Sequence, residues 1–235
     1  MTVHSNIQDG KAAEAVTAGN KRVLIVTAVD AERDAVLRGL QGIPDVDVIA
    51  AGVGAAAAAA RTAAMLAPSA IAYRLVISAG IGGGFVGQAE IGSLVVANLI
   101  VAADLGAETP EGFLSLDELG FGSARIPASA AWSNRLFDAI HSAGLPVCSG
   151  PILTVTTATG TAETTVALAE RVSGAAAEGM EGHGVAVAAA GFGIPVTEIR
   201  AISNAVGPRD RAAWRIGEAL ASLEAASKAI REVFT

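Results

Sequence analysis

Short apolar runs rich in β-branched residues recur along this chain, and helical segments separate them. Four of these runs are Val23–Thr27, Leu75–Ser78, Leu94–Val101 and Val196–Ile202. Continuous apolar runs of this length are typical of strands that are buried on both faces. Strands that alternate with helices predict a three-layer α/β/α sandwich around a mixed, mostly parallel, twisted sheet.

The remaining segments complete this alternation. Two further strands are predicted at Val46–Ala50 and Ile152–Thr156, and a long loop at Ala103–Gly122. The predicted helices are Asp30–Leu37, an Ala-rich segment that follows Gly54 and ends near Pro68, Trp132–Ala143, Ala162–Val172, Met180–Gly191 and Trp214–Phe234. We expect residues 1–20 to form a flexible N-terminal extension and residues 21–235 to form one domain.

The composition narrows the class of function. Hydrophobic residues make up 52% of the 235 residues and charged residues 17%, which indicates a folded core and excludes a disordered chain. The net charge of −7, without a basic run, argues against nucleic-acid binding. No apolar run reaches the roughly 18 residues of a membrane span. We therefore expect a small-molecule substrate.

Cysteine and histidine usage adds two expectations. The lone Cys148 cannot form an internal disulfide, which fits a reducing cytoplasm. The three histidines, His4, His141 and His183, are scattered without the spacing of metal ligands, so we expect no metal site.

Two glycine motifs follow predicted strands. Gly52-Val53-Gly54 fits either a dinucleotide-binding turn or an ordinary tight turn into a helix. The dinucleotide interpretation needs an acidic residue roughly 20 positions later, and none occurs between Ala55 and Ala89. The second motif, Ser78–Gly84, is expected to be either a turn that lets a ligand approach the backbone or simply a flexible turn.

Three polar motifs are candidates for chemistry, and each also has an ordinary structural explanation. Glu32 lies near a helix start, where a capping or surface role is common. Glu178-Gly179-Met180-Glu181 places two carboxylates beside an apolar helix; they need partners such as sugar hydroxyls, unless they only cap that helix. Arg200–Asp210 brings Arg, Ser and Asn to a strand end, or forms a structural turn.

The order and spacing of these motifs resemble the purine nucleoside phosphorylase and nucleosidase superfamily. Within it the chain looks like the methylthioadenosine/S-adenosylhomocysteine nucleosidase branch, and its narrower similarity is to the futalosine hydrolases. That narrower similarity lies in Ala103–Glu108 with Gly112–Leu116, and in Ser203–Asp210 with Trp214. The resemblance implies a nucleoside phosphorylase-like fold, no cofactor, and a homodimer or higher homo-oligomer.

The resemblance also implies roles for individual residues. Glu32 would activate or position the attacking water, and Asn204 would contact the base. Glu181 and Met180 would hold the ribose, while Arg200 and Ser203 would support the strand end. The other substrate-binding residues would be Gly82, Gly83, Thr157, Ala158, Thr159, Glu178, Gly179 and Trp214. Phe113, Leu114 and Phe121, with Trp214, are candidates for contacts to the non-purine arm of the substrate.

Two departures from the wider superfamily suggest the reaction. Asn204 stands where adenine-cleaving nucleosidases have Asp, and its amide suits a 6-oxopurine such as hypoxanthine. Ser78 and Ile81 stand where hexameric phosphorylases bind phosphate with Arg and Ser, which favours water as the nucleophile. Gly179 and His183 also depart from the pattern; the glycine leaves one expected contact open, and the histidine fits a packing role.

The resemblance therefore implies hydrolysis of futalosine to hypoxanthine and dehypoxanthinylfutalosine, a step of menaquinone biosynthesis. One alternative is an adenine-releasing nucleosidase that acts on methylthioadenosine or aminofutalosine, against which Asn204 argues. Another is a non-catalytic nucleoside-binding module, against which the presence of both Glu32 and Glu181 argues. An NAD-dependent oxidoreductase is disfavoured by the missing acidic residue.

Overall fold

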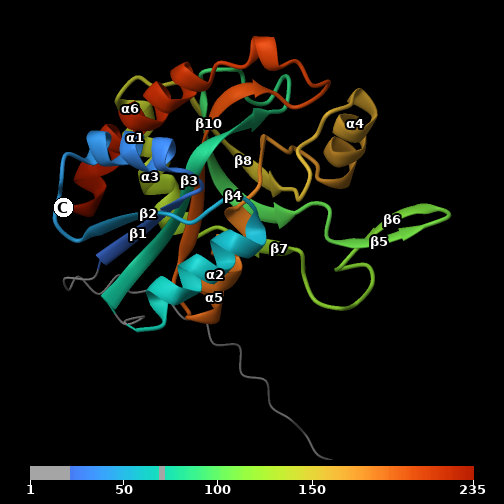
Figure 1. Ribbon diagram of the computed structural model, residues 1–235, viewed down its shortest axis with the longest axis horizontal. Coiled ribbons are helices and arrows are strands. Elements are labelled where there is room, and N and C mark those ends of the chain that lie inside the picture. Colours follow the sequence, from blue (N-terminus) through green and yellow to red (C-terminus); the bar gives the residue numbers. More distant parts are fainter. Residues whose placement is uncertain (1–21, 69–71) are drawn as a thin grey trace, which may run out of the picture.

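The computed structural model describes residues 22–68 and 72–235 (Figure 1). The extension predicted for residues 1–20 lies outside the described residues. In the part described, one large sheet follows the strand order β10-β4-β8-β9-β3-β1-β2, with β7 paired to β4. Its strands are β1 Arg22–Thr27, β2 Val46–Ala50, β3 Tyr73–Gly84, β4 Leu94–Ala102, β7 Arg125–Pro127, β8 Val147–Thr154, β9 Ala177–Gly179 and β10 Val196–Ala205.

The sheet is mixed and mostly parallel, as predicted. Parallel pairs join β1 to β2, β1 to β3, β3 to β10, β4 to β8 and β8 to β9. Antiparallel pairs join β10 to β4, β3 to β9 and β4 to β7. Because β10 pairs with both β3 and β4, the sheet also closes on itself through β3, β10, β4, β8 and β9. This closure brings β3, β9 and β10 together.

Helices cover both faces of the sheet, which confirms the predicted three-layer class (Figure 1). One hydrophobic cluster packs helices α1 Asp30–Leu40, α3 Ala130–Ser142 and α6 Ile216–Phe234 against one face. A second cluster packs α2 Ala55–Leu66 and α5 Gly182–Gly191 against the other face. Helix α4 Ala162–Arg171 contributes Leu168 to a smaller third cluster beside β4 and β8.

The glycine motif that was predicted as a turn is part of a strand. Residues Ala79–Gly84 continue β3, and they are paired with β10 along one side and with β9 at Gly83 and Gly84. The prediction was wrong because glycine weakens an isolated strand, whereas this segment is paired with β10 along its length and with β9 at its end. These partners lie about a hundred residues away in the sequence.

Several other boundaries differ from the prediction. The predicted loop Ala103–Gly122 contains a hairpin of β5 Gly106–Thr109 and β6 Gly112–Ser115. Strand β7 was missed, as was β9, whose residues Ala177–Gly179 precede a helix that begins at Gly182 rather than Met180. The last helix begins at Ile216, after a 3₁₀ turn at Arg211–Ala213. Strand β8 begins at Val147 and β10 ends at Ala205.

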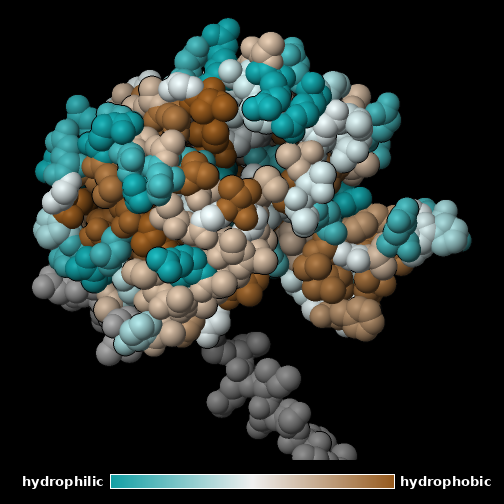
Figure 2. All heavy atoms as spheres, viewed as in Figure 1, coloured by the Kyte–Doolittle hydropathy of each residue, from teal (hydrophilic) through white to brown (hydrophobic). Residues whose placement is uncertain are grey.

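The β5–β6 hairpin extends away from the rest of the molecule (Figure 1). Leu105, Leu114 and Phe121 of this region are exposed, and Phe121 is 77% accessible. Figure 2 shows apolar atoms gathered on the segment that projects from the body. In a single copy of the chain, the hairpin therefore exposes apolar side chains to solvent.

Among the described residues, no helix has the length and apolar character needed to cross a bilayer.

Helix α1 packs closely on α6 at Gly39, and this contact yields a stability prediction. A Cβ at Gly39 would overlap the Glu224 carbonyl oxygen and lie 2.6 Å from Ser227 Cβ. We expect Gly39→Ala to lower the free energy of unfolding in urea by about 1–3 kcal/mol, because the two helices must separate. Gly191→Ala, at the end of α5 with open space around it, should instead raise stability by up to about 1 kcal/mol. Equal effects of the two substitutions would contradict the packing argument.

Candidate active site

Glu32 is a buried carboxylate held by backbone N–H groups. It lies in the first turn of α1, directly after β1, and is 3% exposed. Its Oε2 accepts hydrogen bonds from the amides of Ala28 (2.9 Å) and Val29 (3.2 Å), and its Oε1 accepts one from the amide of Ile81 (2.9 Å). A carboxylate oxygen has two lone pairs, so Oε1 retains one position for a further donor.

Glu181 lies at the other side of the site, immediately before α5. Its Oε1 accepts a hydrogen bond from the Gly54 amide at 3.1 Å, and its Oε2 accepts one from the Met180 amide at 3.3 Å. Gly52 and Gly54 have φ values of 94° and 95°, which favour glycine. The Gly52-x-Gly54 motif is therefore a tight turn into α2 that brings a backbone donor to Glu181.

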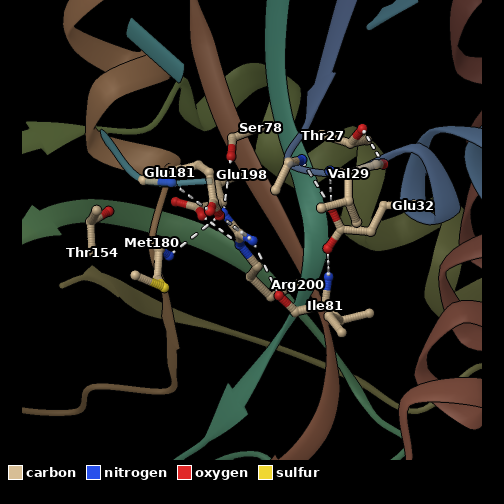
Figure 3. Close-up of polar contacts among 12 residues, drawn as sticks. Thr27, Val29, Glu32, Ser78, Ile81, Thr154, Met180, Glu181, Glu198 and Arg200 are labelled. Atoms are coloured by element: carbon tan, nitrogen blue, oxygen red, sulfur yellow. Dashed lines mark hydrogen bonds and ion pairs between the residues drawn. The ribbon is translucent and has the colours of Figure 1, made fainter. Parts of the chain in front are cut away.

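Arg200 connects the two sides (Figure 3). It lies within β10 and is 2% exposed. Its Nη1 is 3.1 Å from Glu181 Oε2 and also donates to the Ile81 carbonyl at 3.1 Å. Burial lowers the pKa of Arg200, but Glu198, Glu181 and Glu32 together raise it above its usual value. The role expected for Arg200, support of a strand end, needs correction, because β10 continues past it and its guanidinium lies at the centre of a carboxylate cluster.

Glycines make room for this guanidinium. A Cβ at Gly80 would lie 2.7 Å from Glu32 Oε1 and 2.9 Å from Arg200 Nη1. A Cβ at Gly179 would lie 2.8 Å from Arg200 Cζ. At Gly82 it would lie 2.6 Å from the Glu178 carbonyl oxygen. Side chains at these positions would displace Arg200 or separate β3 from β9.

Asn204 and Glu178 lie on either side of the same glycine. Gly83 of β3 is paired with Asn204 of β10 and with Glu178 of β9. Asn204 Oδ1 accepts a hydrogen bond from Ser203 Oγ at 2.8 Å, and its Nδ2 donates one to the Ala205 carbonyl at 2.9 Å. The Ser203 hydroxyl has one hydrogen, and the Gly82 carbonyl, 3.2 Å from Oγ, is the alternative acceptor for it. The second Nδ2 hydrogen of Asn204 remains available to a ligand.

Glu178 is bound by the loop that follows β8. Its Oε1 accepts a hydrogen bond from the Thr159 amide at 2.9 Å, and its Oε2 accepts one from Thr159 Oγ1. Burial raises the pKa of Glu178 above its usual value, and the two Thr159 donors oppose that shift. Thr159 therefore binds Glu178, whose strand pairs with Gly83, and Gly83 pairs in turn with Asn204.

In the described part of the chain, the side chains of four other expected site residues form no hydrogen bond with Arg200, Glu32 or Glu181. Thr157 and Ala158 are exposed. Figure 3 shows the Met180 side chain directed away from Arg200. Trp214 follows the 3₁₀ turn, with the guanidinium carbons of Arg209 and Arg211 at 5.1 and 6.0 Å from its ring centroid.

The aromatic and apolar residues proposed for the non-purine arm are also dispersed. Phe113 and Leu114 lie on the projecting hairpin, where the Arg171 guanidinium stacks 3.6 Å from the Phe113 ring centroid. Phe121 is exposed in the same region. In one copy of the chain, the structure does not bring these side chains to Trp214.

The arrangement suits chemistry on a polar organic molecule. Two buried carboxylates, Glu32 and Glu181, face one guanidinium, and an amide lies further along the same strand. Ser78 Oγ, 1% exposed as a residue, accepts a hydrogen bond from Arg200 Nη2 at 3.3 Å. The Ile81 amide is engaged with Glu32. In the described part of the chain, no group of three His, Cys, Asp or Glu side chains could hold a metal ion.

Glu198 is the residue of this cluster that sequence reasoning missed. Its Oε1 accepts a hydrogen bond from Arg200 Nε at 2.7 Å, and its side chain is fully buried. The signal was present in the sequence: two opposite charges stand two residues apart within the apolar run Val196–Ile202. Side chains two apart in a strand point to the same face, so they can pair.

Comparisons with known proteins agree with this architecture. A family model described as the phosphorylase superfamily matches residues 22–235. A futalosine hydrolase of Streptomyces coelicolor is 51% identical over 219 residues, which cover 86% of this chain and 91% of that protein. A futalosine hydrolase of Acidothermus cellulolyticus is 46% identical over 220 residues, which cover 88% of this chain and 89% of that protein.

Solved structures share the fold at lower identity. The native structure of a Helicobacter pylori futalosine hydrolase superposes with a TM-score of 0.76 at 18% identity, covering 91% of this chain and 98% of that one. A 5′-methylthioadenosine/S-adenosylhomocysteine nucleosidase of the same organism, with butyl-thio-DADMe-Immucillin-A, gives a TM-score of 0.75 at 19% identity. That match covers 90% of this chain and 97% of the nucleosidase chain.

Proposed function

Because this chain belongs to the phosphorylase superfamily, and within it to the family of the futalosine hydrolases, we propose that it hydrolyses the N-ribosyl bond of futalosine. The products are hypoxanthine and dehypoxanthinylfutalosine, and the reaction is a step of menaquinone biosynthesis. The observation that carries the proposal is the pair of buried carboxylates, Glu32 and Glu181, that face one guanidinium from two sides.

Bond cleavage builds positive charge on the sugar and negative charge on the departing base. The bond between the anomeric carbon and the base nitrogen breaks, and its electron pair leaves with the base. Glu181 supports this step by accepting hydrogen bonds from the ribose hydroxyls, with Met180 beside the sugar. Glu32 and Glu181 together supply negative charge near the cationic sugar, which stabilises the transition state.

Water completes the reaction at the anomeric carbon. The water oxygen bonds to the sugar, and one of its protons passes to Glu32. The departing base anion takes up a proton from solvent to give hypoxanthine, and Glu32 releases its proton to solvent. Oε1 is the oxygen suited to this step, since Oε2 accepts from two backbone amides while Oε1 accepts from the Ile81 amide alone. General-base catalysis of this kind typically contributes two to four decades in rate.

Asn204 acts on the leaving base. Its free Nδ2 hydrogen donates to the base as negative charge develops there, and Ser203 fixes the amide by donating to Oδ1. An amide both donates and accepts, so it suits a 6-oxopurine better than adenine. The family resemblance assigns the remaining substrate contacts to Glu178, Thr157, Ala158 and Thr159, to Gly82, Gly83 and Gly179, and to Trp214.

Water rather than phosphate is the nucleophile. A phosphate dianion needs free cationic or hydroxyl donors. Ser78 and the Arg200 guanidinium are already engaged with each other and with carboxylates, and three carboxylates surround that guanidinium. Their charge would repel a dianion.

The decisive experiment measures base release. Purified protein is incubated with futalosine, methylthioadenosine or inosine, each with and without phosphate, and free bases are separated chromatographically. We expect hypoxanthine from futalosine at a rate independent of phosphate. Release of adenine from methylthioadenosine would favour an adenine-releasing nucleosidase. Release of hypoxanthine from inosine only in the presence of phosphate would favour a phosphorylase. Binding without release would identify a nucleoside-binding module.

We also propose a cytoplasmic homodimer or higher homo-oligomer. The single Cys148 fits a reducing compartment. The exposed apolar side chains of the β5–β6 region are suited to contact with a second copy. Sedimentation equilibrium of the purified protein tests the assembly state.

A further inference from the structure

Glu198 is a fully buried carboxylate in the interior of a strand. It is 0% exposed, and Val196 and Ile202 of the same strand belong to the buried apolar cluster that includes α2 and α5. Its Oε2 has no hydrogen-bond partner among the described residues. Burial raises the pKa of Glu198, and the Arg200 guanidinium opposes that shift. Because a buried ion pair often stabilises a fold no more than well-packed apolar residues do, folding stability alone gives no reason for the Glu198–Arg200 pair.

The carboxylate of Glu198 determines where the guanidinium of Arg200 lies. The 2.7 Å bond from Arg200 Nε to Glu198 Oε1 is the shortest of the contacts that Arg200 makes. A guanidinium is planar and rigid, so a fixed Nε also fixes the directions of Nη1 and Nη2. The two residues lie on the same face of β10, which lets them pair without any bend in the strand.

Arg200 passes this constraint to Glu181. Its Nη1 is 3.1 Å from Glu181 Oε2, and the same nitrogen donates to the Ile81 carbonyl. The charged groups that face Arg200 are Glu198 on its own strand, Glu181 at the start of α5 and Glu32 on α1. Glu198 and Glu181 therefore share one positive charge.

Glu198 cannot contact the substrate itself. A Cβ at Gly182, the first residue of α5, would overlap the Glu198 carboxylate, so this carboxylate lies directly behind the helix start. Figure 3 shows the carboxylates of Glu198 and Glu181 gathered at the Arg200 guanidinium. Any influence of Glu198 on the reaction must pass through Arg200.

We propose that Glu198 is a positioning residue that controls, through Arg200, how Glu181 binds the sugar hydroxyls. This inference rests on the proposed function. While Glu198 is present, the guanidinium divides its charge between two carboxylates. Without that charge, Arg200 is drawn to Glu181 alone. The Glu181 carboxylate then becomes a weaker acceptor for the substrate at Oε1, which accepts only the Gly54 amide and keeps one free position.

The test is Glu198→Gln, which preserves the volume and one acceptor but removes the charge. We expect KM for futalosine to rise about tenfold while kcat changes less than about threefold, since the lost interaction concerns sugar binding. The matched control is Glu224→Gln. Arg38 Nε donates to Glu224 Oε2 at the same 2.7 Å, but both side chains are exposed, so this variant should keep wild-type constants.

A double-mutant cycle separates positioning from a merely structural role. If Glu198 acts through Glu181, adding Glu198→Gln to Glu181→Gln should change KM less than about twofold. A wild-type KM in Glu198→Gln would overturn the proposal. A tenfold rise in KM on adding Glu198→Gln both to the wild type and to Glu181→Gln would overturn it as well. Glu198→Gln could yield too little folded protein, and Glu198→Asp is then the variant to measure. It keeps the negative charge but moves it away from Arg200 Nε, so it should also raise KM. A wild-type KM in Glu198→Asp would then overturn the proposal.

Failure of the proposed function is recognised separately, because wild-type protein would then release no hypoxanthine from futalosine. In that case the same cycle is measured from unfolding in urea, which needs no substrate. Non-additive effects of Glu198→Gln and Glu181→Gln on the free energy of unfolding are expected from a shared guanidinium. Additive effects would overturn the coupling between the two carboxylates.

Discussion

Replacing Glu32 with glutamine should lower kcat for futalosine hydrolysis at least a hundredfold while the fold persists. The amides of Ala28 and Val29 both donate to Oε2, so the glutamine oxygen will occupy that position and its NH₂ group will face Ile81. The atom that should accept the proton of water then has no lone pair to offer. Loss of a general base costs typically two to four decades in rate.

The measurement is single-turnover hydrolysis of futalosine, with folding checked by circular dichroism. The unpaired Ile81 amide should lower the free energy of unfolding by about 1–3 kcal/mol, which leaves the protein folded at 25 °C. Asp34→Asn is the control on the same helix, because Asp34 only pairs with Arg33 near the surface. Near-normal turnover in Glu32→Gln would show that Glu32 is not the general base.

Replacing Arg200 with methionine should cause the largest loss of stability. The substitution leaves Glu198 and Glu181 buried without their shared cation, and Glu198 is 0% and Glu181 6% exposed. Removal of one partner from a buried ion pair costs about 3–5 kcal/mol, a large fraction of the stability of a typical domain. We expect a much lower midpoint of urea unfolding, or no soluble folded protein.

The control for Arg200→Met is Arg38→Met. Arg38 also pairs with a glutamate through Nε, but its side chain is 57% exposed, and such pairs contribute at most about 1 kcal/mol. The comparison therefore separates burial from charge pairing. Losses of equal size in the two variants would show that the carboxylates around Arg200 do not depend on its charge.

Local patterns predicted most of the elements correctly. The β-branched runs gave β1, β2 and the apolar parts of β3, β4 and β10, since burial on both faces leaves a continuous apolar signature. The acidic first turn of α1 and the periodicity of α6 marked those helices. Segments without a local signature were missed: β7 and β9 are three residues long, and the glycines of β3 are strand only because β9 and β10 pair with them.

The chemical groups of the candidate site were identifiable from the sequence, but most of their contacts were not. Glu32, Glu181 and Asn204 were proposed because the order of their motifs resembles a known superfamily, and that order can be read directly from the sequence. The Gly54 amide donates to Glu181, which is 127 residues away in the sequence, and the Ile81 amide donates to Glu32, which is 49 residues away. These contacts depend on which strands become neighbours.

The sequence by itself determined the class of fold and supplied the candidate residues for chemistry, because periodicity and side-chain identity are local. Tertiary structure alone decided that Arg200 and Glu198 are buried together, that three carboxylates face one guanidinium, and that glycines 80, 179 and 182 make room for that cluster. The physical reason is that the energy of a buried charge depends on its partners, and strand register, set over the whole sheet, decides which partners it meets.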